Sequence, residues 1–82
     1  MKHELKILPQ YFEAVQSGEK LFEIRSCKDR DFNKGDTVRL REIEECGSYP
    51  HYTGRELIVE ITYVTTYEQK PGFCVFGIKE VE

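Results

Sequence analysis

Three charged side chains of different chemistry stand close together in one short segment of the chain. Lys20, Glu23 and Arg25 supply an ammonium, a carboxylate and a guanidinium. In an extended strand successive side chains alternate between two faces, so Glu23 and Arg25 share one face. A carboxylate accepts hydrogen bonds from the edge of a base, and a guanidinium donates two hydrogen bonds to one phosphate. We therefore expect a strand that buries Phe22 and Ile24 on one face and presents these charges on the other.

The position of this segment, directly after a break in regular secondary structure, allows two interpretations. Gly18 marks the break, and Lys20 stands at the start of the strand. Beside the C-terminal end of a helix, the three charged groups would form a polar pocket in an otherwise apolar wall. A half-buried strand in which Glu23 and Arg25 form a structural ion pair has the same spacing. Spacing alone leaves both interpretations open.

The composition is that of one small globular domain, residues 1–82. The chain is 39% hydrophobic and 33% charged, and a domain of this size buries only about 60–65% of its unfolded surface. No stretch is long and apolar enough to cross a bilayer, and the first residues lack the apolar run of a signal peptide. The expected compartment is therefore the cytoplasm.

The cysteines and histidines give no pattern of a disulfide framework or a metal site. Cys27, Cys46 and Cys74 are odd in number and far apart, which favours reduced cysteines that pack in the core. His3 and His51 have no partner at the spacing of metal ligands. No phosphate-binding loop or hydrolase motif is present. We therefore expect no metal ion and no cofactor.

Positive charge is concentrated in the middle of an acidic chain. The chain has a net charge of −3, whereas residues 25–41 contain six cations and three carboxylates, a local excess of +3. The six cations are Arg25, Lys28, Arg30, Lys34, Arg39 and Arg41. A basic stripe of this kind can bind a polyanion, and a solvated surface of mixed charge is the alternative. On the first interpretation Lys28, Arg30, Arg39 and Arg41 would contact phosphates.

The hydrophobic pattern predicts one short helix among five strands. The expected strands are residues 3–8, 20–26, 37–45, 55–66 and 73–79, with a helix from Pro9 to Ser17 and a loop over 46–54. This order, β-α-β-β-β-β, indicates an α+β fold that is mainly β, with a small curved sheet closing into a partial barrel. Tyr11 and Phe12 are expected in the core. Because Ile43 is out of phase with Leu40, we expect either a β-bulge near residues 41–42 or a change of neighbouring strands there.

The charged segment resembles a known family signature. Gly18, Lys20, Glu23 and Arg25 match the G-x-K-x-x-E-x-R signature of ASCH domains, which are named for homology to the human activating signal cointegrator and belong to the PUA-like superfamily. The Lys34-Gly35-Asp36 turn before a strand is similar to that family. The segment Tyr52-Thr53-Gly54-Arg55-Glu56 resembles short bacterial and phage members. The resemblance covers nearly the whole chain.

The resemblance implies a PUA-like pseudobarrel of five or six strands that binds RNA or a nucleotide-like ligand. Lys20, Glu23 and Arg25 would line the binding cleft, and Gly18 would form the turn that lets the backbone approach. Tyr49 and Tyr52 would offer stacking surfaces for unpaired bases. The implied function is an RNA-binding module in regulation linked to transcription or translation.

Two other functions are compatible with the resemblance. Some small ASCH proteins are amidohydrolases that act on acetylated cytidine through a lysine, a threonine three residues later and a glutamate from a later strand. Here the lysine would be Lys20, Glu23 occupies the position of the threonine, and Glu56 or Glu60 is the candidate late carboxylate. A protein-interaction domain is the third hypothesis. The oligomeric state is left open.

Overall fold

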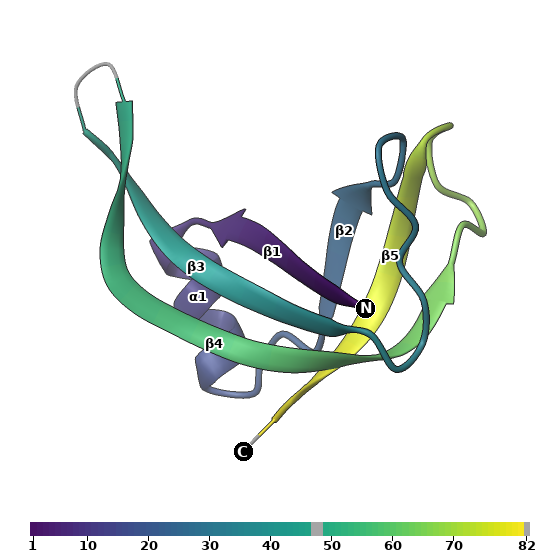
Figure 1. The fold of residues 1–82 in the computed structure, drawn as a ribbon, viewed down its shortest axis with the longest axis horizontal. Coiled ribbons are helices and arrows are strands. Elements are labelled where there is room, and N and C mark those ends of the chain that lie inside the picture. Colours follow the sequence, from purple (N-terminus) through teal and green to yellow (C-terminus); the bar gives the residue numbers. More distant parts are fainter. Residues whose placement is uncertain (47–48, 82) are drawn as a thin grey trace.

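One sheet of five strands, curled into half a barrel, carries a single short helix (Figure 1). The computed structural model describes residues 1–46 and 49–81. The elements in chain order are β1 (Lys2–Ile7), α1 (Pro9–Gln16), β2 (Phe22–Ser26), β3 (Thr37–Cys46), β4 (Tyr49–Thr65) and β5 (Phe73–Glu80). The predicted α+β fold, mainly β, with one helix after the first of five strands is confirmed.

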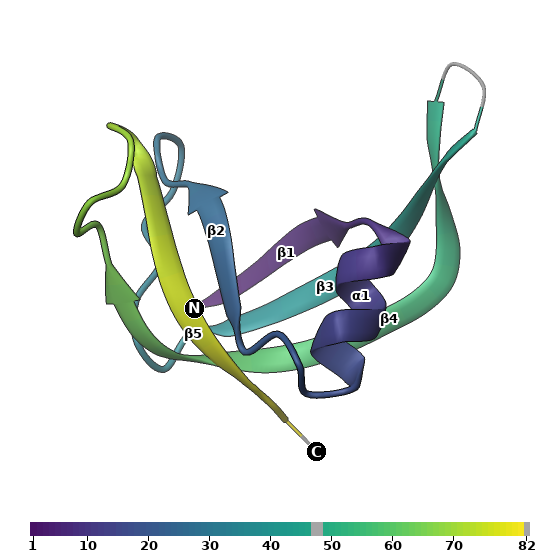
Figure 2. The same cartoon turned by 180° about the vertical axis from the view of Figure 1, so that it is seen from behind.

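The order of strands in the sheet is β1-β3-β4-β5-β2, so the first two strands of the chain form its two edges. β1 pairs with β3 in parallel, and the other three pairings are antiparallel. In both views the sheet bends between β4 and β5, which sets β2 and β5 at a steep angle to the other strands (Figures 1 and 2). The chain crosses from one edge of the sheet to the other through α1.

The core lies inside the bend and is built from alternate residues of the strands, from α1 and from the connection between β2 and β3. Its buried members are Ile7, Phe12, Val15, Phe32, Val38, Leu40, Val59, Ile61, Cys74, Phe76 and Ile78. Phe32 anchors the connection between β2 and β3, since its ring centroid lies 4.7 Å from that of Phe76. The expected burial of Tyr11 is wrong. Its side chain is 48% exposed, because α1 has only eight residues and turns Phe12 and Val15 to the sheet.

The end of α1 determines where β2 begins. Pro9 is the first helical residue, where its missing N–H costs no hydrogen bond. After the helix, Gly18 adopts a φ of +85°, as expected for a glycine that ends a helix. The N–H of Lys20 then donates to the carbonyl of Ala14 at 3.0 Å. This hydrogen bond fixes Lys20 against the helix C-terminus, directly before β2.

The β3–β4 hairpin is longer than the pattern predicted. The expected bulge is confirmed, because the register of β3 against β4 shifts between Arg41 and Ile43. The expected loop over 46–54 is wrong, since β4 already begins at Tyr49. Beyond the bulge β3 and β4 continue to pair, and Gly54, with a φ of +95°, absorbs the irregularity. Residues 47 and 48, which belong to the expected loop, lie outside the described residues.

A buried carboxylate ties the start of β3 to β1. Asp36 Oδ2 accepts a hydrogen bond from the Asn33 N–H at 3.0 Å and lies 2.8 Å from His3 Nε2, and Asp36 Oδ1 accepts from the terminal ammonium of Met1 at 3.2 Å. These bonds, with His3 the main contributor, hold the pKa of Asp36 below its ordinary value of 3.8 despite burial. A carboxylate with a lowered pKa stabilises the fold above its ordinary pKa, and this contribution is lost as the pH falls through the folded-state pKa.

We expect Asp36→Asn to lower the midpoint of thermal unfolding by about 5 °C at neutral pH. An amide has only one acceptor oxygen, so it cannot replace both Oδ2, which meets Asn33 and His3, and Oδ1, which accepts from the Met1 ammonium. The difference between the two proteins should shrink below about pH 4, where the wild-type carboxylate becomes protonated. Circular dichroism melts at neutral and acidic pH measure both effects. An Asp36→Asn protein as stable as the wild type at neutral pH would contradict this role.

Candidate functional site

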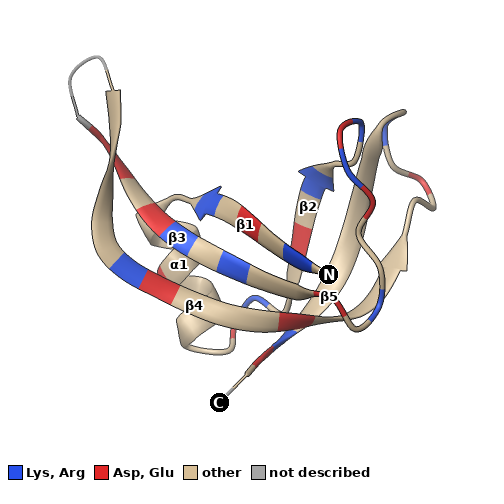
Figure 3. Cartoon of the chain, viewed as in Figure 1, with Lys and Arg blue, Asp and Glu red and all other residues tan. Residues whose placement is uncertain are grey.

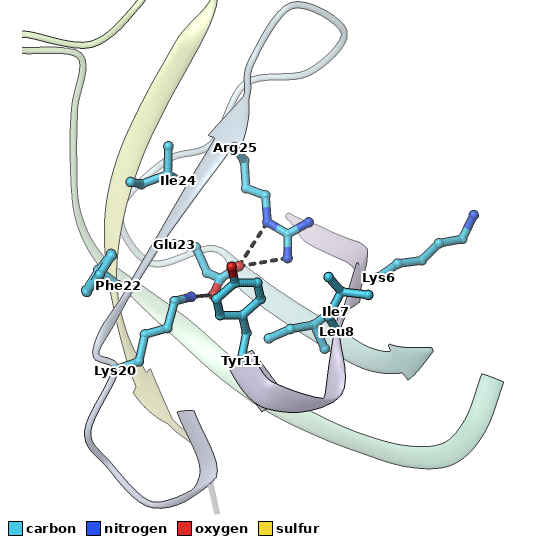
Figure 4. Close-up of a pocket in the computed structure, with 9 residues that line it drawn as sticks. All are labelled: Lys6, Ile7, Leu8, Tyr11, Lys20, Phe22, Glu23, Ile24 and Arg25. Atoms are coloured by element: carbon cyan, nitrogen blue, oxygen red, sulfur yellow. Dashed lines mark hydrogen bonds and ion pairs between the residues drawn. The ribbon is translucent and has the colours of Figure 1, made fainter. Parts of the chain in front are cut away.

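A pocket of about 480 Å³ opens between β1 and β2, where the sheet is not closed (Figure 4). One side is formed by the end of β1 and the start of α1, and the other by β2 and the residues before it. The lining residues are Lys6, Ile7, Leu8, Tyr11, Lys20, Phe22, Glu23, Ile24 and Arg25. The pocket therefore contains three of the four residues of the G-x-K-x-x-E-x-R signature.

Glu23 is the centre of a hydrogen-bonded cluster in this pocket. Its side chain is only 3% exposed, and Lys20 Nζ donates to its Oε2. Arg25 donates to Glu23 Oε1 through Nε at 2.9 Å and through Nη2 at 2.7 Å. Figure 4 shows both cations reaching the carboxylate from opposite sides. With two cations and one carboxylate, the cluster carries a formal charge of +1, which suits an anionic ligand.

β2 turns its charged face inward, which is the reverse of the predicted orientation. Glu23 pairs with Phe76 of β5 and is buried, whereas Phe22 is 44% and Ile24 is 53% exposed. The alternation of faces along β2 is as predicted, but the burial of Phe22 and Ile24 is wrong. Lys20 and Arg25 satisfy Glu23, so the inner face can hold a carboxylate, whereas Phe22 and Ile24 on the outer face stay largely exposed.

Two aromatic rings flank the cluster. Lys20 Nζ lies 5.5 Å from the ring centroid of Tyr11 and 5.2 Å from that of Phe22. Distances of this order are typical of cation–π contacts, which hold an ammonium over a ring face. The exposure of Tyr11, which its position in the pocket explains, leaves an aromatic surface beside the charges. The pocket thus combines hydrogen-bond donors with surfaces on which a planar group can stack.

The other candidate cations do not join this pocket. Arg39 and Arg41 each donate to a carboxylate oxygen of Glu4 at 3.2 Å, and Arg39 also pairs with Glu56. Cationic and anionic segments lie side by side on β1, β3 and β4 (Figure 3). Arg30 Nη1 donates to the carbonyl of Glu4 at 3.4 Å. The predicted basic stripe is therefore divided, and most of it belongs to a surface of mixed charge.

The remaining predicted site residues also lie outside the pocket. Lys28 is exposed in the connection between β2 and β3. Tyr49 and Tyr52 lie on the β3–β4 hairpin, where they are 73% and 46% exposed. The ring of Tyr52 is covered by the guanidinium of Arg41, whose Cζ lies 3.8 Å from the ring centroid. Gly18 forms the turn before β2 without lining the pocket.

The burial of a third carboxylate, after Asp36 and Glu23, was not predicted. Glu42 is 2% exposed, and its carboxylate accepts hydrogen bonds from the hydroxyl of Thr53 at 2.6 Å and from Arg55 at 2.8 and 2.6 Å. Arg55 chiefly, and Thr53, hold the pKa of Glu42 below its ordinary value of 4.5. The guanidinium of Arg55 also lies over the ring of Phe12, 4.7 Å from its centroid. This cluster joins the bulged hairpin to α1.

The sequence contains one signal for this cluster. The Thr53-Gly54-Arg55 segment places a hydroxyl and a guanidinium on either side of a glycine with positive φ. Nothing in the alternation of β3 indicates that Glu42 is buried, because the bulge itself changes which residues face inward.

The late carboxylates of the hydrolase hypothesis are not in the pocket. Glu56 pairs with Arg39, and Glu60 lies 3.8 Å from Lys79 on the neighbouring strand. Among the described residues no group of three or more histidine, cysteine, aspartate or glutamate side chains is arranged to hold a metal ion. Likewise, no helix in the described ranges is long and apolar enough to span a bilayer.

Comparisons with known proteins identify relatives of the chain. It is 40% identical over 63 residues to an uncharacterized 12.9 kDa protein in the GpA 3' region of Escherichia phage P2. The match covers 77% of this chain and 53% of that relative, so the chain spans about half the length of the curated relative that it matches. A family model, described as a domain of unknown function, DUF3850, matches residues 2–78. The chain therefore belongs to the DUF3850 family.

Proposed function

We propose that this domain binds single-stranded RNA and holds one nucleotide in the pocket between β1 and β2. The observation that carries the proposal is the convergence of Lys20, Glu23 and Arg25 beside the rings of Tyr11 and Phe22. A guanidinium and an ammonium attract a phosphate, and exposed rings stack on unpaired bases. A pocket of about 480 Å³ lies in the usual range for small organic ligands.

The fold supports placing the domain in the PUA-like superfamily, as an ASCH-like member. Its five-stranded curled sheet, with one helix before the signature strand, is compatible with the pseudobarrel that the G-x-K-x-x-E-x-R resemblance implies. The relative from phage P2 supports a phage or bacterial setting. A small RNA-binding domain in that setting would act in the regulation of transcription or translation, inside the cytoplasm.

Fluorescence anisotropy with labelled hexamers of uridine and of adenosine, at low salt, tests the proposal. We expect the wild type to bind at least one hexamer and Arg25→Gln to bind it about tenfold more weakly, because a charge-assisted hydrogen bond to phosphate is lost. Lys34→Gln removes the same charge from an exposed turn outside the pocket, so it serves as the matched control.

Two results would overturn the proposal. One is the absence of binding to either hexamer, and the other is equal affinity for wild type and Arg25→Gln. Incubation with acetylated cytidine, followed by chromatography, tests the competing hypothesis that the domain is an amidohydrolase. Release of acetate that depends on Lys20 would support an amidohydrolase in place of an RNA-binding module.

A further inference from the structure

The pocket lies along an open edge of the sheet. β2 is the last strand in the order β1-β3-β4-β5-β2, so only one of its sides is paired. Phe22 and Ile24 lie on the outer face of β2, whereas Glu23 and Arg25 lie on the inner face, and all four line the pocket. A pocket that touches both faces of a strand must run along its edge. The backbone of β2 is therefore part of the pocket wall.

Two backbone hydrogen bonds show which residues of this segment face β5. The carbonyl of Leu21 accepts from the Ile78 N–H at 3.0 Å, and the N–H of Cys27 donates to the carbonyl of Gly72 at 2.8 Å. In an antiparallel pair, the N–H and C=O groups of alternate residues point to the same neighbour. The odd-numbered residues of this segment therefore turn their backbone groups to β5.

The backbone groups of Phe22 and Ile24 consequently point to the open edge. Their register partners on β5 are Gly77 and Val75, and both pairs are of the kind that exchanges no hydrogen bonds. No backbone hydrogen bond joins these two residues to another part of the described chain. Two N–H donors and two C=O acceptors are thus available in the pocket wall, next to the cluster around Glu23.

We propose that these backbone groups hydrogen-bond the Watson–Crick edge of an unpaired base. The proposal rests on the proposed function and adds how the nucleotide is recognised. In a strand edge, the N–H and the C=O of one residue stand side by side as a donor and an acceptor. The Watson–Crick edge of every base also carries a donor beside an acceptor, which is free only in single-stranded RNA. The domain then selects unpaired nucleotides with little preference among bases.

An extended peptide is the other ligand that a strand edge can accept. Such peptides bind by adding a strand to the sheet. β2 has only five residues, and two of its outward-facing residues line the pocket. The cluster of Lys20, Glu23 and Arg25 and the ring of Tyr11 lie at the same edge, which favours a compact ligand with an anionic group and a planar group. These features favour a nucleotide over a peptide strand.

Methylated RNA tests the proposal on the wild-type protein. Hexamers of 3-methyluridine and of 5-methyluridine differ only in the position of the methyl group on each base. The first methyl blocks the Watson–Crick edge, and the second leaves it free. We expect 5-methyluridine to bind as uridine does and 3-methyluridine to bind at least tenfold more weakly, because a hydrogen bond is lost and its backbone partner is left unsatisfied. Hexamers of inosine and 1-methylinosine, whose bases are both uncharged at neutral pH, provide a similar comparison for a purine.

A backbone substitution tests the protein side of the same contact. Ile24→Pro removes the N–H that points to the open edge, and proline is tolerated on an edge strand when its nitrogen faces away from the sheet. Ile24→Ala removes the side chain but keeps the N–H. We expect Ile24→Pro to bind uridine hexamer at least tenfold more weakly than Ile24→Ala does. Thermal unfolding of both variants shows whether β2 is still paired with β5.

The outcomes distinguish this proposal from the proposed function. If no hexamer binds, the proposed function itself fails. If uridine hexamer binds and Arg25→Gln weakens it, but 3-methyluridine binds as tightly as 5-methyluridine, then RNA is bound without the backbone edge and this inference is overturned. Equal affinity of folded Ile24→Pro and Ile24→Ala for uridine hexamer overturns it as well. The inference also fails if the wild type binds an extended peptide and Ile24→Pro abolishes peptide binding but leaves RNA binding unchanged.

Discussion

Replacing Glu23 with alanine is expected to lower the free energy of unfolding by about 3 kcal/mol, because it leaves two largely buried cations without their carboxylate. The side chains of Lys20 and Arg25 are only 18% and 23% exposed, so water screens their repulsion poorly. A domain of 82 residues has a total stability of about 4–12 kcal/mol, so the loss is a large part of the whole. Urea unfolding followed by circular dichroism measures it.

Removing all three charges together should have the opposite effect on stability. A variant with Lys20→Met, Glu23→Leu and Arg25→Met replaces a buried ion cluster by apolar side chains of similar size, a change that is often neutral or stabilising. We expect this triple variant to unfold at the urea concentration of the wild type or above, and to lose RNA affinity at least a hundredfold, which corresponds to about 3 kcal/mol. Lys34→Met, outside the pocket, should change neither quantity.

This pair of variants separates the two interpretations of the cluster. If the cluster is only structural, the triple variant keeps any RNA affinity that the wild type has. A triple variant that is as unstable as Glu23→Ala would instead show that the apolar replacements do not fit the pocket, and would contradict the stability argument.

The buried pair of Glu42 and Arg55 is expected to have a large effect on stability and no effect on RNA binding. Arg55→Ala leaves Glu42 buried without its main partner, and we expect the midpoint of thermal unfolding to fall by about 10 °C at neutral pH. Glu42→Ala should cost less, because the Arg55 side chain is 47% exposed and can be hydrated. Arg30→Ala, on the partly exposed β2–β3 connection, is the control.

The pH dependence of this effect has a definite sign. In the wild type Arg55 lowers the pKa of Glu42, so the charged carboxylate stabilises the folded state at neutral pH. This stabilisation is lost as the pH falls below the ordinary pKa of 4.5. Without Arg55, burial disfavours the charged carboxylate, so protonation stabilises the variant. The difference in melting temperature between wild type and Arg55→Ala should therefore shrink from neutral pH to about pH 4. A constant difference across this range would contradict the assignment.

The sequence predicted the positions of the strands better than the direction of their faces. Alternation placed Glu23 and Arg25 on one face of β2, which is correct. The assumption that the apolar face is buried was wrong, because β2 is an edge strand on which Phe22 and Ile24 remain 44% and 53% exposed. Hydrophobicity predicts burial only when something packs against the apolar side. The local pattern carries no information on that point.

The candidate site was predictable only where it is local in sequence. Lys20, Glu23 and Arg25 stand within one segment, and a helix end and a strand suffice to bring them together. Arg39 and Arg41 were grouped with them by charge, but their partner Glu4 comes from β1, whose parallel pairing with β3 no short-range pattern indicates. The place of Tyr11 in the pocket was likewise not predictable, because it depends on how α1 packs beside β2 in the folded chain.

The position of β2 in the sheet has a consequence for how the protein is made. β2 pairs only with β5, and Glu23 stands opposite Phe76, near the other end of the described chain. Because synthesis proceeds from the N-terminus, the residues of β2 leave the ribosome before those of β5. Until β5 has emerged, β2 has no strand to pair with. The pocket wall therefore forms only after β5 has emerged. If the pocket binds RNA as proposed, nascent chains and products of interrupted translation would lack this wall and would not compete for the ligand.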